Sequence, residues 1–139
     1  MTSTDQRFEP SCPAHCLVRK VPENFADCLR ELPVSIDQEA AVRQHANYVA
    51  LLQKHAREVS FVPAPGGSAD SVYIEDVAVI TGNHALVTRP GAPSRQPEVD
   101  GIAEALGPFC QVHTTDVPAC IDGGDVMQIG RVLLVGLSK

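Results

Sequence analysis

Apolar residues in the first part of the chain recur at the three- and four-residue spacing of helices. Residues 22–32 are predicted to form a short helix, because three apolar residues then share one face: Phe25, Leu29 and Leu32. A longer helix is predicted over residues 37–56, beginning near a capping box formed by Ser35 and Gln38. Four apolar residues are expected to turn its inner face towards a core: Val42, Ala46, Val49 and Leu52.

Strand-like segments flank and follow these helices. Residues 15–20 and 60–63 are short and extended. Beyond them the apolar pattern shortens to the period of strands, and Gly82 and Asn83 supply the turn of a β-hairpin. The elements predicted in this part are a hairpin with strands at 77–81 and 85–88, a helix over 97–106, a strand over 110–114 and a second hairpin with strands at 126–129 and 132–135. The inner face of that helix is predicted to hold Val99, Ile102, Ala103 and Leu106.

The two predicted hairpins resemble each other in sequence. They begin 49 residues apart (125 minus 76), and a fixed period indicates a repeat architecture. The unit is a hairpin followed by a helix and a strand, so the expected fold class is α/β, built from ββαβ units. The matched positions are Asp76 and Asp125, Ile80 and Ile129, Gly82 and Gly130, and Val87 and Val135.

The second unit contains a hairpin but neither the helix nor the last strand of the first unit. A hairpin without its covering helix exposes an apolar face and an unpaired edge, which favours association. We therefore expect a truncated chain, or a partner or second copy that covers this hairpin. The expected organisation is a flexible tail over residues 1–14 and an incomplete repeat domain over residues 15–139.

Composition narrows the function classes. The 139 residues are 44% hydrophobic and 20% charged, an ordinary globular balance, and the net charge is −6. This charge argues against a nucleic acid or an anionic membrane as partner and fits a cationic small molecule. No apolar run approaches a membrane span, and the N-terminus lacks a signal-peptide core, so a cytoplasmic protein is expected. The five cysteines do not suggest a disulfide framework, and Cys12 and Cys16 lack the second pair of a zinc site.

Three carboxylates crowd together at Asp70, Glu75 and Asp76, between apolar strand segments. In an extended chain Asp70 and Asp76 point the same way and Glu75 points opposite, unless a turn near Val77 re-aims them. Carboxylates at a strand end can bind a guanidinium, whose planar fork offers paired N–H donors. A solvated loop that avoids aggregation is the alternative interpretation.

Other candidate residues follow strands or lie in turns. Arg89 leaves a predicted strand just before Pro90-Gly91 and could hold a substrate carboxylate, although a surface arginine explains it equally well. The turn from Asp122 to Asp125 could orient a histidine, bind a cation or serve only as a turn. His84 and His113 have no evident catalytic partner and are interpreted as structural.

Four segments, in order along the chain, resemble the motifs of dimethylarginine dimethylaminohydrolases. They are Asp70-Ser-Val-Tyr-Ile-Glu-Asp76, Thr88-Arg-Pro-Gly-Ala-Pro-Ser-Arg95, Ile121-Asp-Gly-Gly-Asp-Val126 and Val135-Gly-Leu-Ser-Lys139. The likeness extends from about residue 15 to the end. It implies a partial pentein αβ-propeller: five ββαβ units of about 49 residues would need about 245 residues, and this chain has little more than half of that.

The resemblance also implies roles for particular residues. Glu75 and Asp76 would grip the guanidinium of a methylated arginine, Asp70 and the backbone of Leu29 would meet its α-amino group, and Arg89 would bind its α-carboxylate. Asp122 would orient a histidine that serves as general acid and base, while a cysteine thiolate attacks the guanidinium carbon and citrulline is released. No cofactor or metal is implied, and the partner is a small-molecule substrate.

This sequence departs from the family pattern in its catalytic groups. The histidine, the nucleophilic cysteine and a second carboxylate-binding arginine of the family lie beyond position 139. Cys110 and Cys120 lie near the Asp122 turn, but neither has a histidine where the family has one. The chain is therefore expected to be inactive alone. An arginine deiminase-like pentein and a non-catalytic guanidinium-binding protein remain alternatives.

Overall fold

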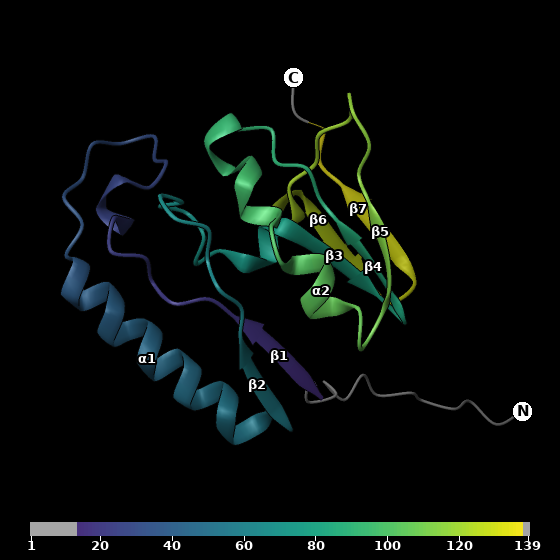
Figure 1. Ribbon diagram of the computed structural model, residues 1–139, viewed down its shortest axis with the longest axis horizontal. Coiled ribbons are helices and arrows are strands. Elements are labelled where there is room, and N and C mark those ends of the chain that lie inside the picture. The colour runs from purple at the N-terminus through teal and green to yellow at the C-terminus, as the bar shows by residue number, and fades with distance from the viewer. Residues whose placement is uncertain (1–13, 138–139) are drawn as a thin grey trace, which may run out of the picture.

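The computed structural model describes residues 14–137, and its three small sheets follow one another along the chain (Figure 1). The expected tail over residues 1–14 lies outside the described residues except for Ala14. Within the described part, no helix combines the length and apolar character needed to cross a membrane.

The first unit is a parallel pair of strands joined by a long helix. Strand β1 (His15–Val18) pairs with β2 (Glu58–Phe61), and α1 (Gln38–His55) connects them. The predicted helix over 37–56 is therefore confirmed. Its predicted cap is wrong, because the Asp37 side chain accepts the Ala40 N–H at 2.9 Å, and Ser35 lies two residues too early to do so.

The inner face of α1 is only partly covered, contrary to expectation. Val49 is buried and Leu52 is half-buried, but Val42 and Ala46 are exposed. A helix of 18 residues is about 27 Å long, whereas a strand of four residues spans about 13 Å, so one two-stranded sheet cannot cover the whole helix. Figure 1 shows α1 running past the end of this sheet.

The predicted helix over 22–32 is wrong. Only a single 3-10 turn, η1 (Phe25–Asp27), forms there, and the Cys28 N–H closes it on the Phe25 carbonyl. The next donor, the Leu29 N–H, is bound by the Asp70 carboxylate instead of by a helical carbonyl. Leu29 and Leu32 are consequently 56% and 69% exposed and do not share a packed face.

The second unit is the complete ββαβ module. Strands β3 (Ala78–Thr81) and β4 (His84–Val87) form the predicted hairpin around Gly82, whose φ of 58° suits glycine. Helix α2 (Ile102–Leu106) then leads to β5 (Gln111–Thr114), which pairs parallel to β4. A buried apolar cluster centres here, joined by Val62 from the end of the first unit: Val62, Val77, Ala85, Val87, Ile102 and Leu106.

The helix predicted over 97–106 is broken into two pieces. A 3-10 helix, η3 (Pro93–Val99), precedes α2, and Gly101 between them adopts a left-handed φ of 77°. The expected inner face survives the break, because Ile102 and Leu106 are buried and Val99 and Ala103 pack against the core.

The third unit repeats the hairpin of the second. Strands β6 (Val126–Ile129) and β7 (Val132–Val135) have the predicted bounds, and the 3-10 turn η4 (Gly123–Asp125) precedes them as η2 (Ile74–Val77) precedes β3. The predicted repeat is thus confirmed in the backbone. Many apolar side chains of this hairpin are exposed: Met127, Ile129, Val132, Leu133, Leu134 and Val135.

Gly123 should tolerate no side chain, because a methyl group there would collide with the Glu75 carbonyl oxygen. We expect Gly123→Ala to lower the free energy of unfolding by at least the roughly 1–3 kcal/mol typical of overpacking. Gly66→Ala is the control, since nothing lies within 4 Å of its added methyl group. Denaturant unfolding followed by circular dichroism measures both variants, and equal stabilities would contradict the contact.

Candidate functional site

The predicted acidic segment is a turn rather than an extended strand. The Tyr73 N–H donates to the Asp70 carbonyl, and the Asp76 N–H donates to the Tyr73 carbonyl, so the chain coils into η2. Of the two geometries considered for this segment, the turn near Val77 forms and the extended chain does not. The 3-10 turn instead buries Asp70 at 7% exposure, half-buries Asp76 and leaves Glu75 exposed.

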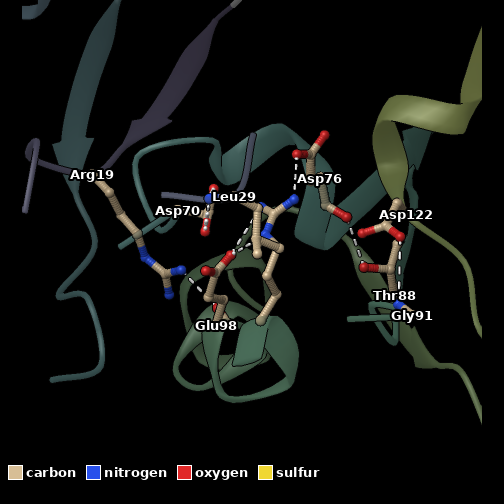
Figure 2. Close-up of polar contacts among 9 residues, drawn as sticks. Arg19, Leu29, Asp70, Asp76, Thr88, Gly91, Glu98 and Asp122 are labelled. Carbon is tan, nitrogen blue, oxygen red and sulfur yellow. Dashed lines mark hydrogen bonds and ion pairs between the residues drawn. The ribbon is translucent and has the colours of Figure 1, made fainter. Parts of the chain in front are cut away.

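Asp70 binds the first loop of the chain. Its two carboxylate oxygens accept the Leu29 N–H at 3.0 and 3.2 Å, across 41 residues of sequence (Figure 2). The structure thus places Leu29 and Asp70, the two residues expected to meet an α-amino group, in direct contact. The neighbouring Tyr73 phenol has a raised pKa, chiefly because burial disfavours its charged form.

Asp76 is fixed by both its backbone and its side chain. The Thr88 hydroxyl donates to the Asp76 carbonyl at 2.8 Å, which ties η2 to the end of β4. The Asp76 Oδ2 atom accepts a hydrogen bond from Arg95 at 2.9 Å, and the Asp76 side chain is 20% exposed. One of the two Asp76 oxygens is therefore already engaged within the protein.

A buried ionic network that the sequence did not reveal stands behind Asp76. Arg95 binds Glu98 at 2.9 Å, and Arg19 donates to the Glu98 and Asp100 carbonyls at 2.6 and 3.0 Å. Arg19 and Glu98 are 0% and 1% exposed. The ion pair between Arg95 and Glu98 could have been predicted locally, because the two opposite charges are three residues apart. Arg19 lies 79 residues from Glu98, so nothing local indicates its part in the network.

Opposing effects act on the charges of this network. Burial raises the pKa of Glu98, and the hydrogen bond and charge of Arg95 oppose that rise. Burial alone would lower the pKa of Arg95, but hydrogen bonds to Glu98 and Asp76 outweigh it, and its net pKa is raised. Burial lowers the pKa of Arg19 against the attraction of Glu98 and Asp100. Arg95 therefore stays protonated, and its positive charge stabilises the half-buried carboxylate of Asp76 and the buried one of Glu98.

Arg89 and Asp122 come together beside the same turn. The Ile121 N–H donates to the Arg89 carbonyl at 2.9 Å, and Asp122 Oδ2 accepts the Gly91 N–H at 3.4 Å. The Arg89 side chain is half-buried and donates to Cys120 Sγ at 2.8 Å. Figure 2 shows Asp122 on the side of Asp76 opposite to Asp70.

The two acidic turns touch through glycines. A methyl group at Gly124 would lie 2.7 Å from Asp76 Oδ1, and one at Gly123 would strike the Glu75 carbonyl. The sequence predicts the Glu75-Asp76 and Asp122–Asp125 segments separately, and the structure packs one against the other. A planar organic cation could be gripped here by carboxylates, with an arginine nearby for an anionic group.

Two other features lie apart from this constellation. A hollow of about 1160 Å³ lies between β1, α1 and α2. Glu75 lines it but no other predicted site residue does, so this hollow is not the predicted guanidinium site. The exposed imidazoles of His84 and His113 stack on each other, with 3.2 Å between their nearest nitrogens. Among residues 14–137 no three potential ligand side chains are grouped to hold a metal ion.

Several known proteins are similar to this chain in sequence and in fold. No family model matches the chain. The chain is 40% identical over 102 residues to an N(G),N(G)-dimethylarginine dimethylaminohydrolase of Streptomyces coelicolor and 33% identical over 104 residues to one of Pseudomonas aeruginosa, each match covering 73% of this chain. These matches cover 40% and 41% of the two relatives, so the chain spans less than half of their length.

A solved structure of the Pseudomonas aeruginosa enzyme, a cysteine-to-serine variant complexed with citrulline, superimposes with a TM-score of 0.83 at 30% identity. The superposition covers 89% of this chain and 50% of that one. The ββαβ module, its repeat and this match define a protein of the pentein type. The chain is similar to dimethylarginine dimethylaminohydrolases over about half of their length.

Removing Arg95 should produce a stability loss that depends on pH. Arg95→Ala leaves Glu98 buried without its cation, and breaking a buried pair costs about 3–5 kcal/mol. Because the pKa of Glu98 is raised in the folded state, folding favours its protonated form. The loss should therefore be largest at pH 7 and shrink as the pH falls towards the ordinary glutamate value of 4.5.

Urea unfolding at pH 7 and at pH 4.5 measures this difference. Arg43→Ala is the matched control, because Arg43 pairs with Glu39 on an exposed face of α1 and such pairs contribute little. A loss of equal size at both pH values would contradict the account of the network.

Proposed function

We propose that this chain recognises methylated arginine for a dimethylarginine dimethylaminohydrolase. The observation that carries the proposal is the packing of the Glu75-Asp76 turn against the Asp122–Asp125 turn, next to Arg89. Sequence similarity supports it, because the similar proteins carry that activity in their names. In this proposal residues 15–139 form part of a propeller built from ββαβ units.

Each site residue has a role that its chemistry suits. Glu75 is exposed and Asp76 is partly exposed, so their free oxygens accept guanidinium N–H groups. Asp70, already directed at the backbone of Leu29, balances the charge of the α-amino group. Arg89 exchanges its contact with Cys120 for the α-carboxylate of the ligand, because a carboxylate accepts two charge-assisted hydrogen bonds where a thiol accepts one weak one.

The reaction itself needs a nucleophile and a proton carrier. A cysteine thiolate adds to the guanidinium carbon, and the C–N bond to dimethylamine breaks as that nitrogen takes a proton. Water then attacks the carbon of the resulting S-alkylthiouronium, and the C–S bond breaks to release citrulline and regenerate the cysteine. In our proposal Asp122 orients the histidine that moves these protons. None of the five cysteines stands in the sequence context of the family nucleophile, so the 139-residue chain is expected to bind the ligand without hydrolysing it.

Two further proposals concern the surroundings of the protein. The exposed apolar residues of β6 and β7 favour self-association through this hairpin. Cys28, Cys110 and Cys120 are free thiols, which are typical of the reducing cytoplasm.

A binding measurement tests the proposed function. We expect the chain to bind asymmetrically dimethylated arginine by isothermal titration calorimetry and to release no citrulline from it. Arg89→Ala should weaken binding by about 1.5–3 kcal/mol, the usual worth of a hydrogen bond to a charged group. Arg57→Ala is the control, since Arg57 is exposed between α1 and β2.

The other outcomes discriminate between functions. Tighter binding of unmodified arginine would favour a deiminase-like protein. Citrulline release by the chain would show that it contains a nucleophile, and Cys110→Ser and Cys120→Ser would then locate it. No binding of either ligand would contradict the proposal.

A further inference from the structure

Arg95 joins two carboxylates that differ in exposure. Its Nη1 donates to Asp76 Oδ2 at 2.9 Å, while Nε and Nη2 both donate to Glu98 Oε2 at 3.0 and 2.9 Å. One planar guanidinium thus uses three N–H groups on two partners. Arg95 cannot turn away from Asp76 without also disturbing Glu98.

The far end of this arrangement is anchored in the protein core. Glu98 is 1% exposed, and its carbonyl accepts a hydrogen bond from Arg19, which follows β1 and is fully buried. Arg19 also donates to the Asp100 carbonyl. The chain of contacts therefore runs from β1 through η3 to Asp76, so the position of the Asp76 carboxylate is set by buried groups.

This contact limits what Asp76 can offer to a ligand. Asp76 Oδ2 is occupied by Arg95. Asp76 Oδ1 makes no hydrogen bond to Arg95, but it lies so close to Gly124 that a methyl group on that glycine would be 2.7 Å from it, so it can be approached from one side only. Free acceptors on this turn are consequently Asp76 Oδ1 and the exposed carboxylate of Glu75. An unmodified arginine guanidinium presents five N–H donors, and two methyl groups on one nitrogen leave three. A site with few acceptors therefore leaves fewer N–H donors without a hydrogen-bond partner when it binds the methylated cation than when it binds unmodified arginine.

We propose that Arg95 is a positioning residue: by holding Oδ2 of Asp76, it makes the site prefer a methylated guanidinium over that of unmodified arginine. The inference rests on the proposed function and adds to it the origin of the substrate preference. Loss of the arginine side chain frees Oδ2, which then accepts an additional N–H that only the less methylated ligand can supply.

Calorimetric titration of the 139-residue chain with asymmetrically dimethylated arginine and with L-arginine tests this inference. The quantity of interest is the ratio of the two Kd values, that for arginine divided by that for the methylated ligand. We expect Arg95→Met to lower this ratio about tenfold, roughly the effect of one charge-assisted hydrogen bond. Arg95→Lys should retain most of the ratio, because an ammonium still occupies Oδ2. Arg57→Met should leave it unchanged.

Each outcome decides a separate point. If the Arg95→Met variant binds both ligands with the ratio of Kd values unchanged, even when both Kd values rise, the inference is overturned and the proposed function stays in place. Binding of neither ligand by the unsubstituted chain overturns the proposed function and this inference with it. If Arg95→Met does not fold by circular dichroism, the double variant Arg95→Met with Glu98→Gln replaces it, because the second change removes the buried unpaired carboxylate while Asp76 Oδ2 stays free. A ratio equal to that of the Glu98→Gln single variant, in which Arg95 still holds Oδ2, would then contradict the inference.

Discussion

The close approach of two 3-10 turns brings the acidic candidate residues Glu75, Asp76 and Asp122 into one place. Gly123 leaves no room for a Cβ atom above the Glu75 carbonyl, and Gly124 leaves none beside the Asp76 carboxylate. Only glycine allows the backbones to approach this closely. The contact brings the acidic turn before β3 beside the acidic turn before β6. Arg89 belongs to the same assembly, because its backbone pairs with Ile121 just before the second turn.

The two turns are repeats of one another and are closed in related ways. Thr88 donates from its hydroxyl to the Asp76 carbonyl, and Gly136, its counterpart after β7, donates from its N–H to the Asp125 carbonyl at 2.8 Å. The first copy additionally carries the buried charges of Arg95 and Glu98, and those charges restrain Asp76. The two copies therefore share a backbone, and the ion pairs of Arg95 distinguish the first copy from the second.

Much of this arrangement can be predicted from local sequence. The hairpins, the long helix and the 49-residue period follow from apolar spacing and turn residues, and the structure confirms them. The helix over 22–32 fails because a distant carboxylate, Asp70, takes the Leu29 N–H, and periodicity contains no information about such a partner. Periodicity also could not decide between an extended chain and a turn near Val77, because the segment coils where it meets η4, 49 residues further on.

The site is predictable in its residue types but not in its pairings. Acidic residues and an arginine at strand ends indicate a guanidinium site, and the family motifs select Leu29, Asp70, Glu75, Asp76, Arg89 and Asp122. The hold of Arg95 on Asp76 depends on a charge chain that reaches Arg19, and only the folded structure brings these groups together. Sequence spacing therefore finds the candidates, whereas tertiary contacts decide which of their atoms are free.

The central claim is that the paired turns form one recognition site for a guanidinium ligand. Backbone amide NMR shifts of the 139-residue chain, recorded while asymmetrically dimethylated arginine is added, test it most directly. The account predicts that the largest shifts occur together at Leu29, Glu75, Asp76, Gly91 and Gly123. Shifts concentrated instead on the inner face of α1, around His45, Tyr48 and Leu52 in the hollow beside β1, would contradict it.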